Sequence, residues 1–188
     1  METINVQKRD FNVKAKKMRR LGMVPGDVFG KSLPESISIQ MEEAVARRLI
    51  RLNREGSKLV MNIDGQILPV QIKEKSLNTV NDEILHISFQ ALTAGEKVNS
   101  VIHIIIDNDE KIAGILERMQ LEIPYTSLPE DMIDTITIDV DGMKPGTVLT
   151  VGEISELKSD KIELHVDSES IVLRVSEKKN YNPIAVEG

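Results

Sequence analysis

Seven cationic side chains crowd the thirteen residues from 8 to 20, in a chain of 188 residues whose net charge is -6. Only Asp10 opposes them there, so they repel one another unless a polyanion neutralises them. Each neutralised phosphate releases a counterion, and arginine adds bidentate hydrogen bonds. The segment predicts phosphate binding, with nucleic acid as the ligand; the alternative is a solvated cationic surface. The seven residues are Lys8, Arg9, Lys14, Lys16, Lys17, Arg19 and Arg20.

The end of this basic segment leads into a turn and an aromatic residue. The stretch KAKKMRR has no clean 3.6-residue rhythm, so it predicts a basic loop or a short irregular helix. Pro25 and Gly26 then let the chain enter a strand abruptly. Phe29 follows, and its ring could stack on a base or pack against a ribose. A core position is the alternative for Phe29, and the residues alone favour it.

A second candidate region is EILHISFQ, which spans Glu83 to Gln90. Its alternation predicts a strand with Leu85, Ile87 and Phe89 in the core and with Ile84, His86 and Ser88 on the outer face. On that face His86 can donate to a phosphate or a 2′-hydroxyl, or lie in solvent.

Catalytic and metal chemistry have little support in the sequence. There is no cysteine, and the three histidines leave no pair at metal-ligand spacing. Walker, G-x-G-x-x-G and G-x-S-x-G motifs are all missing. We therefore expect no enzyme, no metal and no cofactor; a hydrolase or transferase with clustered carboxylates is the alternative. We assign no function to His103 and His165, which fall on polar faces of alternating runs.

The ends of the chain and its apolar runs bear on location. The amino terminus has no apolar core typical of a signal peptide, and the longest apolar run, around residues 104–106, is far short of a membrane span. We expect a cytoplasmic protein with no membrane partner.

Charge is divided unevenly along the chain. Residues 1–93 hold 15 Lys and Arg against 11 Asp and Glu, whereas residues 94–188 hold 9 against 19. Net charges of +4 and -10 indicate two domains, and the length suits two small ones. We expect a basic, nucleic-acid-binding domain over residues 1–92, an acidic β-rich domain over residues 93–176, and a disordered tail over residues 177–188.

Short alternating runs predict a mainly β fold with short helices. Residues 41–54 have the apolar rhythm of one amphipathic helix, with Met41, Val45, Leu49 and Leu52 on its apolar side. Residues 58–63 and 67–72 predict a hairpin through Asp64 and Gly65. After Gly95, further short strands and Gly-containing turns predict a sandwich or barrel-like domain.

The motifs resemble those of a known family. KKMRRLGMVPGDVFG is similar to the basic arm and R-R-x-G-x-x-P-G-x-x-Y-G segment of the bacterial general stress protein Ctc family, which are large-subunit ribosomal proteins that bind 5S rRNA. EILHISFQ resembles that family's E-I-x-H-x-D-F strand. LPEDMIDTITIDVDGMKPGTVLTVGEI, over residues 128–154, resembles the second domain of its longer members.

The resemblance implies an amino-terminal six-stranded β-barrel that binds 5S rRNA, followed by a β-rich domain. It implies a non-catalytic component of the large ribosomal subunit that contacts neighbouring ribosomal proteins and is not expected to bind DNA. The RNA-binding residues implied are Arg9, Arg19, Arg20 and His86, with Lys14, Lys16 and Lys17 as phosphate neighbours and Phe29 and Ser88 beside them.

Two positions depart from the family pattern. Phe29 stands where the family usually has Tyr, which keeps the ring and loses a hydroxyl donor. Ser88 stands where it usually has Asp, which keeps a hydrogen-bonding group and loses a charge. These departures leave an alternative open, namely a stress-response or protein-interaction module that acts away from the ribosome with weakened RNA binding.

Overall fold

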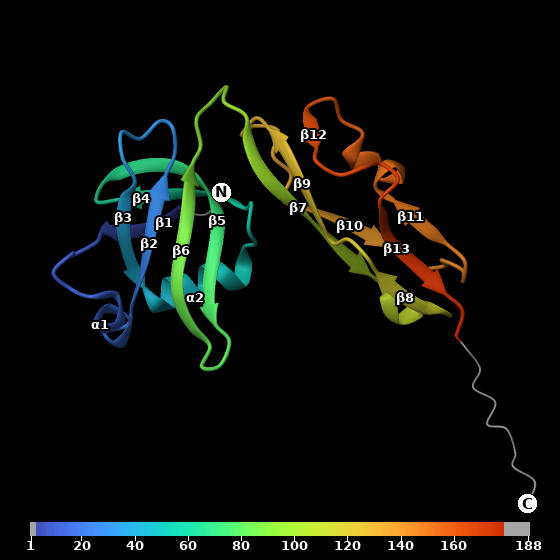
Figure 1. Cartoon of the computed structure of the whole chain (residues 1–188), viewed down its shortest axis with the longest axis horizontal. Coiled ribbons are helices and arrows are strands. Elements are labelled where there is room, and N and C mark those ends of the chain that lie inside the picture. The colour runs from blue at the N-terminus through green and yellow to red at the C-terminus, as the bar shows by residue number, and fades with distance from the viewer. Residues whose placement is uncertain (1–2, 179–188) are drawn as a thin grey trace, which may run out of the picture.

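The computed structural model describes residues 3–178, which form a β-barrel followed by an elongated β domain (Figure 1). The mainly β fold with an amino-terminal six-stranded barrel is confirmed. The predicted disordered tail lies outside the described residues from residue 179 onward. The barrel comprises β1 (Thr3–Lys8), α1 (Ala15–Arg20), β2 (Met23–Phe29), β3 (Ile37–Glu42), α2 (Glu43–Leu52), β4 (Lys58–Ile63), β5 (Gln66–Asn78) and β6 (Glu83–Ala91).

The barrel closes in the order β1-β3-β2-β6-β5-β4. Four of the neighbouring pairs, β1-β3, β3-β2, β6-β5 and β5-β4, are antiparallel. The other two, β2-β6 and β1-β4, are parallel. Asp64 and Gly65 form the predicted hairpin turn with φ values of 48° and 96°, which suit a two-residue turn. The core is aliphatic apart from Phe89, because β-branched and other aliphatic side chains fill the alternating inward positions.

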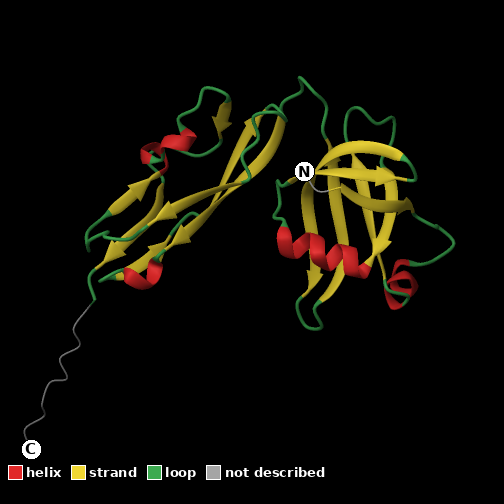
Figure 2. Ribbon diagram, turned by 180° about the vertical axis from the view of Figure 1, so that it is seen from behind, coloured by secondary structure: helices red, strands yellow, loops and turns green. Residues whose placement is uncertain are grey.

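Helix α2 lies behind the strands in Figure 1 and in front of them in Figure 2. It is shorter than predicted, and its buried side chains are Ala46 and Leu49. Met41 belongs to β3 instead, and Leu52 is 58% exposed, so the predicted apolar side of the helix was partly wrong. No helix within residues 3–178 is long and apolar enough to cross a membrane.

Strand β6 departs from simple alternation. Ser76 pairs with His86 and Leu77 pairs with Ile84, so Leu85 is the extra residue of a β-bulge. As a result Ile84 is buried at 2% exposure, while Leu85 is only half-buried. The prediction that placed Ile84 outside and Leu85 in the core was therefore wrong, whereas Ile87 and Phe89 are in the core as predicted.

The second domain contains two small sheets. The first has the order β10-β7-β9-β12 and the second has the order β11-β13-β8. The second domain has two hydrophobic clusters, of which the larger contains the fully buried Tyr125. Strand β8 was not predicted, since its four residues lack a clear alternation. The strands are β7 (Val98–Asp107), β8 (Ile115–Arg118), β9 (Glu122–Ser127), β10 (Thr135–Asp139), β11 (Val148–Thr150), β12 (Ile162–Leu164) and β13 (Ile171–Ser176).

Polar contacts join the two domains. His103 on β7 is buried, and its Nε2 lies 2.8 Å from the carbonyl oxygen of Glu55. Gln71 Nε2 donates to the carbonyl oxygen of Asn99 at 3.1 Å, and Lys58 Nζ donates to that of Pro129 at 2.6 Å. His103 is therefore a structural contact between the domains, a role that its place in an alternating run did not indicate.

Gly56 is the tightest point of this contact, and we expect Gly56→Ala to destabilise the protein more than Gly65→Ala. Both glycines have positive φ, at 85° and 96°, so alanine strains the backbone in both. A Cβ at Gly56 would also lie 2.6 Å from Ser100 Oγ and 2.9 Å from the carbonyl oxygen of Val101, whereas nothing lies within 4 Å at Gly65. Such overpacking costs roughly 1 to 3 kcal/mol.

Urea unfolding of both variants measures the difference. Equal losses of unfolding free energy in the two variants would show that the two domains are not closely packed at Gly56.

Candidate nucleic-acid interface

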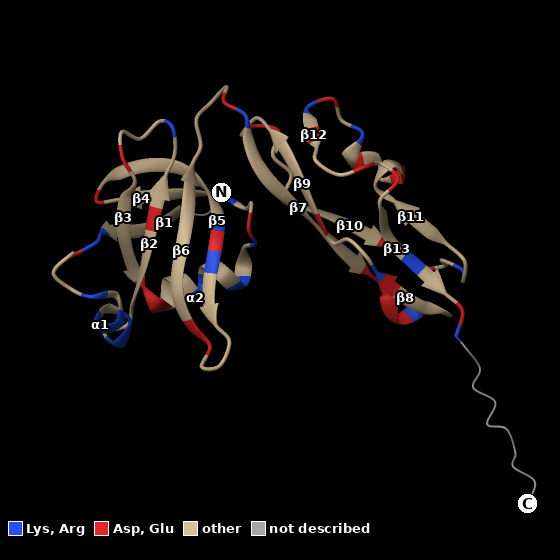
Figure 3. Ribbon diagram, in the orientation of Figure 1, with Lys and Arg blue, Asp and Glu red and all other residues tan. Residues whose placement is uncertain are grey.

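A row of polar side chains crosses the outer face of four barrel strands. Asp27 on β2 pairs with Ser38 on β3 and with Ser88 on β6, and Ser88 pairs in turn with Glu74 on β5. Residues directly opposite in paired strands share a face of the sheet, so the four side chains lie side by side. The acidic positions on β2 and β5 are visible as red segments in Figure 3.

Strands β2 and β6 come close because of a glycine. Gly26 pairs with Ile87, and a Cβ on Gly26 would lie 2.6 Å from the carbonyl oxygen of Ile87 and 3.3 Å from Ile39 Cγ1. A side chain at this inward position would push the two strands apart. Gly26 therefore fixes the distance between its neighbours Asp27 and Ser88.

Asp27, Ser88 and His86 form a connected cluster. Ser88 Oγ donates to Asp27 Oδ1 at 2.7 Å, and it lies 3.4 Å from His86 Nδ1. The same Asp27 oxygen lies 3.4 Å from His86 Nε2. His86 and Ser88 face outward as predicted, and the side chains of His86 and Asp27 are 39% and 29% exposed. Sequence analysis missed Asp27, because only the strand register brings it to Ser88.

Phe29 lies on the same outer face, two residues beyond Asp27. Val28 between them is fully buried, whereas Phe29 is half-buried and lies outside the core cluster. The expectation of a core position for Phe29 was therefore wrong. Its ring is available at the surface, next to Gln90 of β6 in the strand register.

The predicted basic loop or irregular helix is the six-residue helix α1. Met18 packs inward at 2% exposure, and this anchor turns the remaining side chains outward. Arg19 is held differently, because its Nε donates to Glu83 Oε1 at 2.9 Å and its side chain is only 18% exposed. The exposed cations of this region, blue in Figure 3, are Lys14, Lys16, Lys17 and Arg20.

Arg9 follows β1 and lies beside an aromatic residue that the sequence analysis did not select. The Arg9 guanidinium carbon is 5.9 Å from the centre of the Phe11 ring, and the backbone N–H of Arg9 donates to Ser38 at 2.9 Å. Arg9 Nε is buried with no hydrogen-bond partner among the described residues. Phe11 is 77% exposed. An aromatic residue between cations was the signal that could have identified it.

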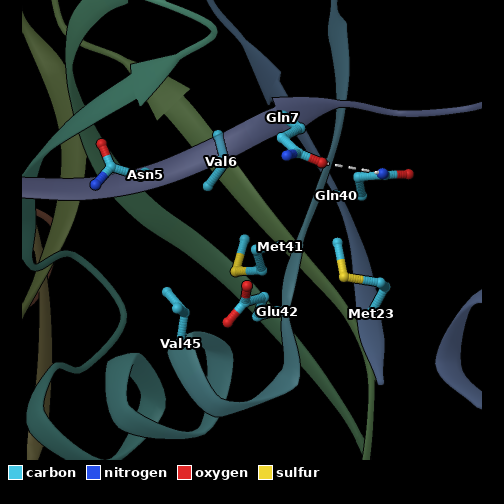
Figure 4. Close-up of a pocket in the computed structure, with 8 residues that line it drawn as sticks. All are labelled: Asn5, Val6, Gln7, Met23, Gln40, Met41, Glu42 and Val45. Carbon is cyan, nitrogen blue, oxygen red and sulfur yellow. Dashed lines mark hydrogen bonds between the residues drawn. The ribbon is translucent and has the colours of Figure 1, made fainter. Parts of the chain in front are cut away.

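A cavity of about 310 Å³ opens where β1 and β3 separate beside α2 (Figure 4). These strands pair only at Gln7 with Gln40 and at Lys8 with Ile39, and Gln40 Nε2 donates to Gln7 Oε1 at 3.5 Å. Among the residues that line the cavity the only charged side chain is that of Glu42, which disfavours a phosphate there. The lining consists of Asn5, Val6, Gln7, Met23, Gln40, Met41, Glu42 and Val45.

Comparison with known proteins identifies both parts of the chain. Residues 4–89 match the model of the Ribosomal L25p family, and residues 97–179 match the model of the ribosomal protein TL5 C-terminal domain. The amino-terminal barrel is thus similar to one ribosomal protein family and the second domain to another. The resemblance drawn from the motifs is confirmed by these two matches, to the Ribosomal L25p family and to the TL5 C-terminal domain.

Several bacterial relatives match along most of their length, and each is named large ribosomal subunit protein bL25. That of Carboxydothermus hydrogenoformans is 29% identical over 187 residues, which are 96% of this chain and 92% of the relative. That of Listeria monocytogenes is 24% identical over 179 residues, or 93% and 85%. That of Akkermansia muciniphila is 29% identical over 164 residues, or 81% of each chain.

The pair of Arg19 and Glu83 predicts a pH-dependent contribution to stability. The hydrogen bond from Arg19 holds the pKa of Glu83 below its ordinary value of 4.5. A carboxylate whose pKa is depressed in the folded state stabilises the protein above its unfolded pKa, and this stabilisation is lost as pH falls through the folded pKa. We therefore expect Glu83→Gln to lower the melting temperature at pH 7 and to have little effect at pH 3.

Thermal melts of the wild type, Glu83→Gln and the control Glu110→Gln at both pH values test this. Glu110 is an exposed carboxylate of the second domain, and its loss should give no pH-dependent gap. A gap for Glu83→Gln that is the same at pH 3 as at pH 7 would contradict the prediction.

Proposed function

We propose that this protein is a component of the large ribosomal subunit that binds 5S rRNA through α1, the Arg9 segment and the polar row of β3, β2, β6 and β5. The observation that carries the proposal is that His86, Ser88 and Phe29 face outward on one side of the barrel. The match of residues 4–89 to the Ribosomal L25p family supports it. The names of its relatives support a ribosomal role, and the motif resemblance supports 5S rRNA as the RNA.

The chemistry of this face suits RNA better than DNA. The deep, narrow major groove of an A-form helix excludes side chains, so proteins recognise its shallow minor groove, its 2′-hydroxyls and its irregular loops. His86 can contact a hydroxyl or a phosphate, and the rings of Phe29 and Phe11 can stack on bases or riboses. The exposed cations of α1 supply attraction to the backbone that does not depend on sequence.

The second domain has the opposite charge and suits a different neighbour. Residues 94–188 carry a net charge of -10, which repels phosphates. The contacts of His103, Gln71 and Lys58 attach this domain to the side of the barrel formed by β4 and β5. We propose that it faces solvent or neighbouring ribosomal proteins, so the protein as a whole is ribosome-associated.

The exposed cations of α1 should determine the salt dependence of binding. We expect the double variant Lys16→Ala with Arg20→Ala to flatten the dependence of log K on log salt by roughly 1.4 to 1.8, taking about 0.7 to 0.9 for each lost phosphate contact. Filter binding to 5S rRNA between 50 and 300 mM salt, roughly the range in which such slopes are resolved, measures this.

The control is Lys144→Ala with Lys158→Ala, which removes the same charge from exposed positions of the second domain. Its slope should equal that of the wild type. If both double variants flatten the slope equally, binding follows net charge and α1 is not the contact. If 5S rRNA binds no better than an unrelated duplex, the proposed function itself is wrong.

Phe11 should contribute by stacking rather than by charge. We expect Phe11→Ala to weaken 5S rRNA binding by roughly 1 to 3 kcal/mol, the range for one base stacked on an aromatic ring, and to leave the salt slope unchanged. Met119→Ala is the matched control, because Met119 is another exposed apolar side chain, at 62%, in the second domain. Equal affinity of Phe11→Ala and Met119→Ala would remove Phe11 from the interface.

A further inference from the structure

We propose that Asp27 is the residue that orients His86 for RNA recognition, and that it acts through Ser88 while offering its second carboxylate oxygen to a donor on the RNA. The donor would be a base amino group or a 2′-hydroxyl. This inference rests on the proposed function, because it names the group that positions the recognition histidine.

The single proton of the Ser88 hydroxyl determines which atoms of the cluster donate hydrogen bonds and which accept them. A serine hydroxyl has one proton, and Ser88 gives it to Asp27 Oδ1 at 2.7 Å. Ser88 Oγ can therefore only accept from His86, whose Nδ1 lies 3.4 Å away. A carboxylate that fixes the hydroxyl in this way turns a lone pair of Ser88 Oγ toward His86 Nδ1, and Asp27 thereby acts on the ring through the serine.

The carboxylate also limits rotation of the ring. Asp27 Oδ1 lies 3.4 Å from His86 Nε2 and 2.7 Å from Ser88 Oγ, so the serine and the aspartate face the same edge of the imidazole, one at each ring nitrogen. Gly26 holds β2 against β6 and keeps Asp27 in register with Ser88. The arrangement thus depends on backbone geometry.

One carboxylate oxygen is left for a ligand. The side-chain hydrogen bond of Asp27 within the described residues involves Oδ1, the His86 ring approaches the same oxygen, and the Asp27 side chain is 29% exposed. An ionised carboxylate accepts several hydrogen bonds and donates none. On an RNA-binding face it repels phosphates and accepts from amino groups or 2′-hydroxyls, so it favours base or sugar contacts at this point.

A purely structural role for Asp27 makes a different prediction. A cross-strand hydrogen bond between β2 and β6 would stabilise the barrel, and its loss would lower the melting temperature without selectively affecting RNA binding. Binding and melting must therefore be measured on the same variants.

The first experiment compares Asp27→Asn with Glu110→Gln by filter binding to 5S rRNA. The amide of Asn has no charge, and it can donate to Ser88 and thereby reverse the direction of that hydrogen bond. We expect about tenfold weaker binding for Asp27→Asn, which corresponds to one lost hydrogen bond to a charged group. Glu110→Gln removes the same charge from an exposed position of the second domain and should not weaken binding.

The second experiment asks whether Asp27 acts through His86. If it does, Asp27→Asn should cost less affinity in the His86→Ala background than in the wild type, because only the contact of the second carboxylate oxygen with the RNA is then left to lose. The swap Asp27→Ser with Ser88→Asp moves the carboxylate across the same register pair and should restore binding to within about threefold, a difference of roughly 0.65 kcal/mol. The ¹⁵N shifts of the His86 ring should change in Asp27→Asn and return in the swap.

The outcomes separate the two proposals. If wild-type protein does not prefer 5S rRNA, the proposed function fails. If the wild type shows the preference but Asp27→Asn binds equally well, only the role of Asp27 fails. Additive losses in the double variant would also overturn the positioning role, and this result does not depend on whether the swap variant folds.

Discussion

The close approach of β2 and β6 is the constraint on which the rest of the barrel depends. These strands are far apart in the chain and pair in parallel, so their contact closes the sheet and leaves no free edge there. Gly26 permits the approach, since any side chain would collide with the carbonyl of Ile87. The same register places Val28 beside Phe89 inside the barrel and Asp27 beside Ser88 outside it. The same strand register therefore closes the core and assembles the outer cluster.

The barrel core is built almost entirely from non-aromatic side chains, and two phenylalanines remain at the surface. The chain has three phenylalanines, and only Phe89 belongs to the barrel core. Phe29 and Phe11 are left at the surface, beside the polar row and the cations. Aliphatic side chains suffice for the interior of a small closed barrel, so these rings are not needed for its packing. They are therefore available for the stacking contacts of the proposed interface.

Local signals in the sequence predicted much of the fold. The Asp64-Gly65 turn, the alternating strands and the amphipathic residues around Leu49 encode their own conformations, and the charge asymmetry indicated two regions. Features that depend on pairing between distant strands were beyond such signals. The bulge at Leu85 reversed the expected face of Ile84, and the burial of His103 depends on contact with Glu55. Both are set by neighbours that no local pattern identifies.

The candidate site shows the same limit. The density of positive charge in the sequence identified the cations of α1. It could not distinguish Arg19 from its neighbour Arg20, although Glu83 pairs with Arg19 and leaves Arg20 exposed. Asp27 carried no signal at all, since a lone aspartate in a predicted strand is ordinary. Only the parallel register of β2 and β6 gives it a partner in Ser88. A carboxylate that motif comparison expects at one position is thus present at its neighbour across the sheet.

This placement of charge divides the proposed interface into two kinds of contact. Exposed cations on α1 attract any phosphate backbone, and this attraction depends on charge number more than on arrangement. Asp27 and Glu74 repel a phosphate placed over the row, by roughly 1 kcal/mol for a pair 4 Å apart in water and by more where water is excluded. A duplex that presents only phosphates is disfavoured there, whereas an irregular loop that presents amino groups or 2′-hydroxyls is favoured. On the proposed function, affinity comes from the basic helix, and discrimination comes from a carboxylate and a histidine held in register by the closure of the barrel.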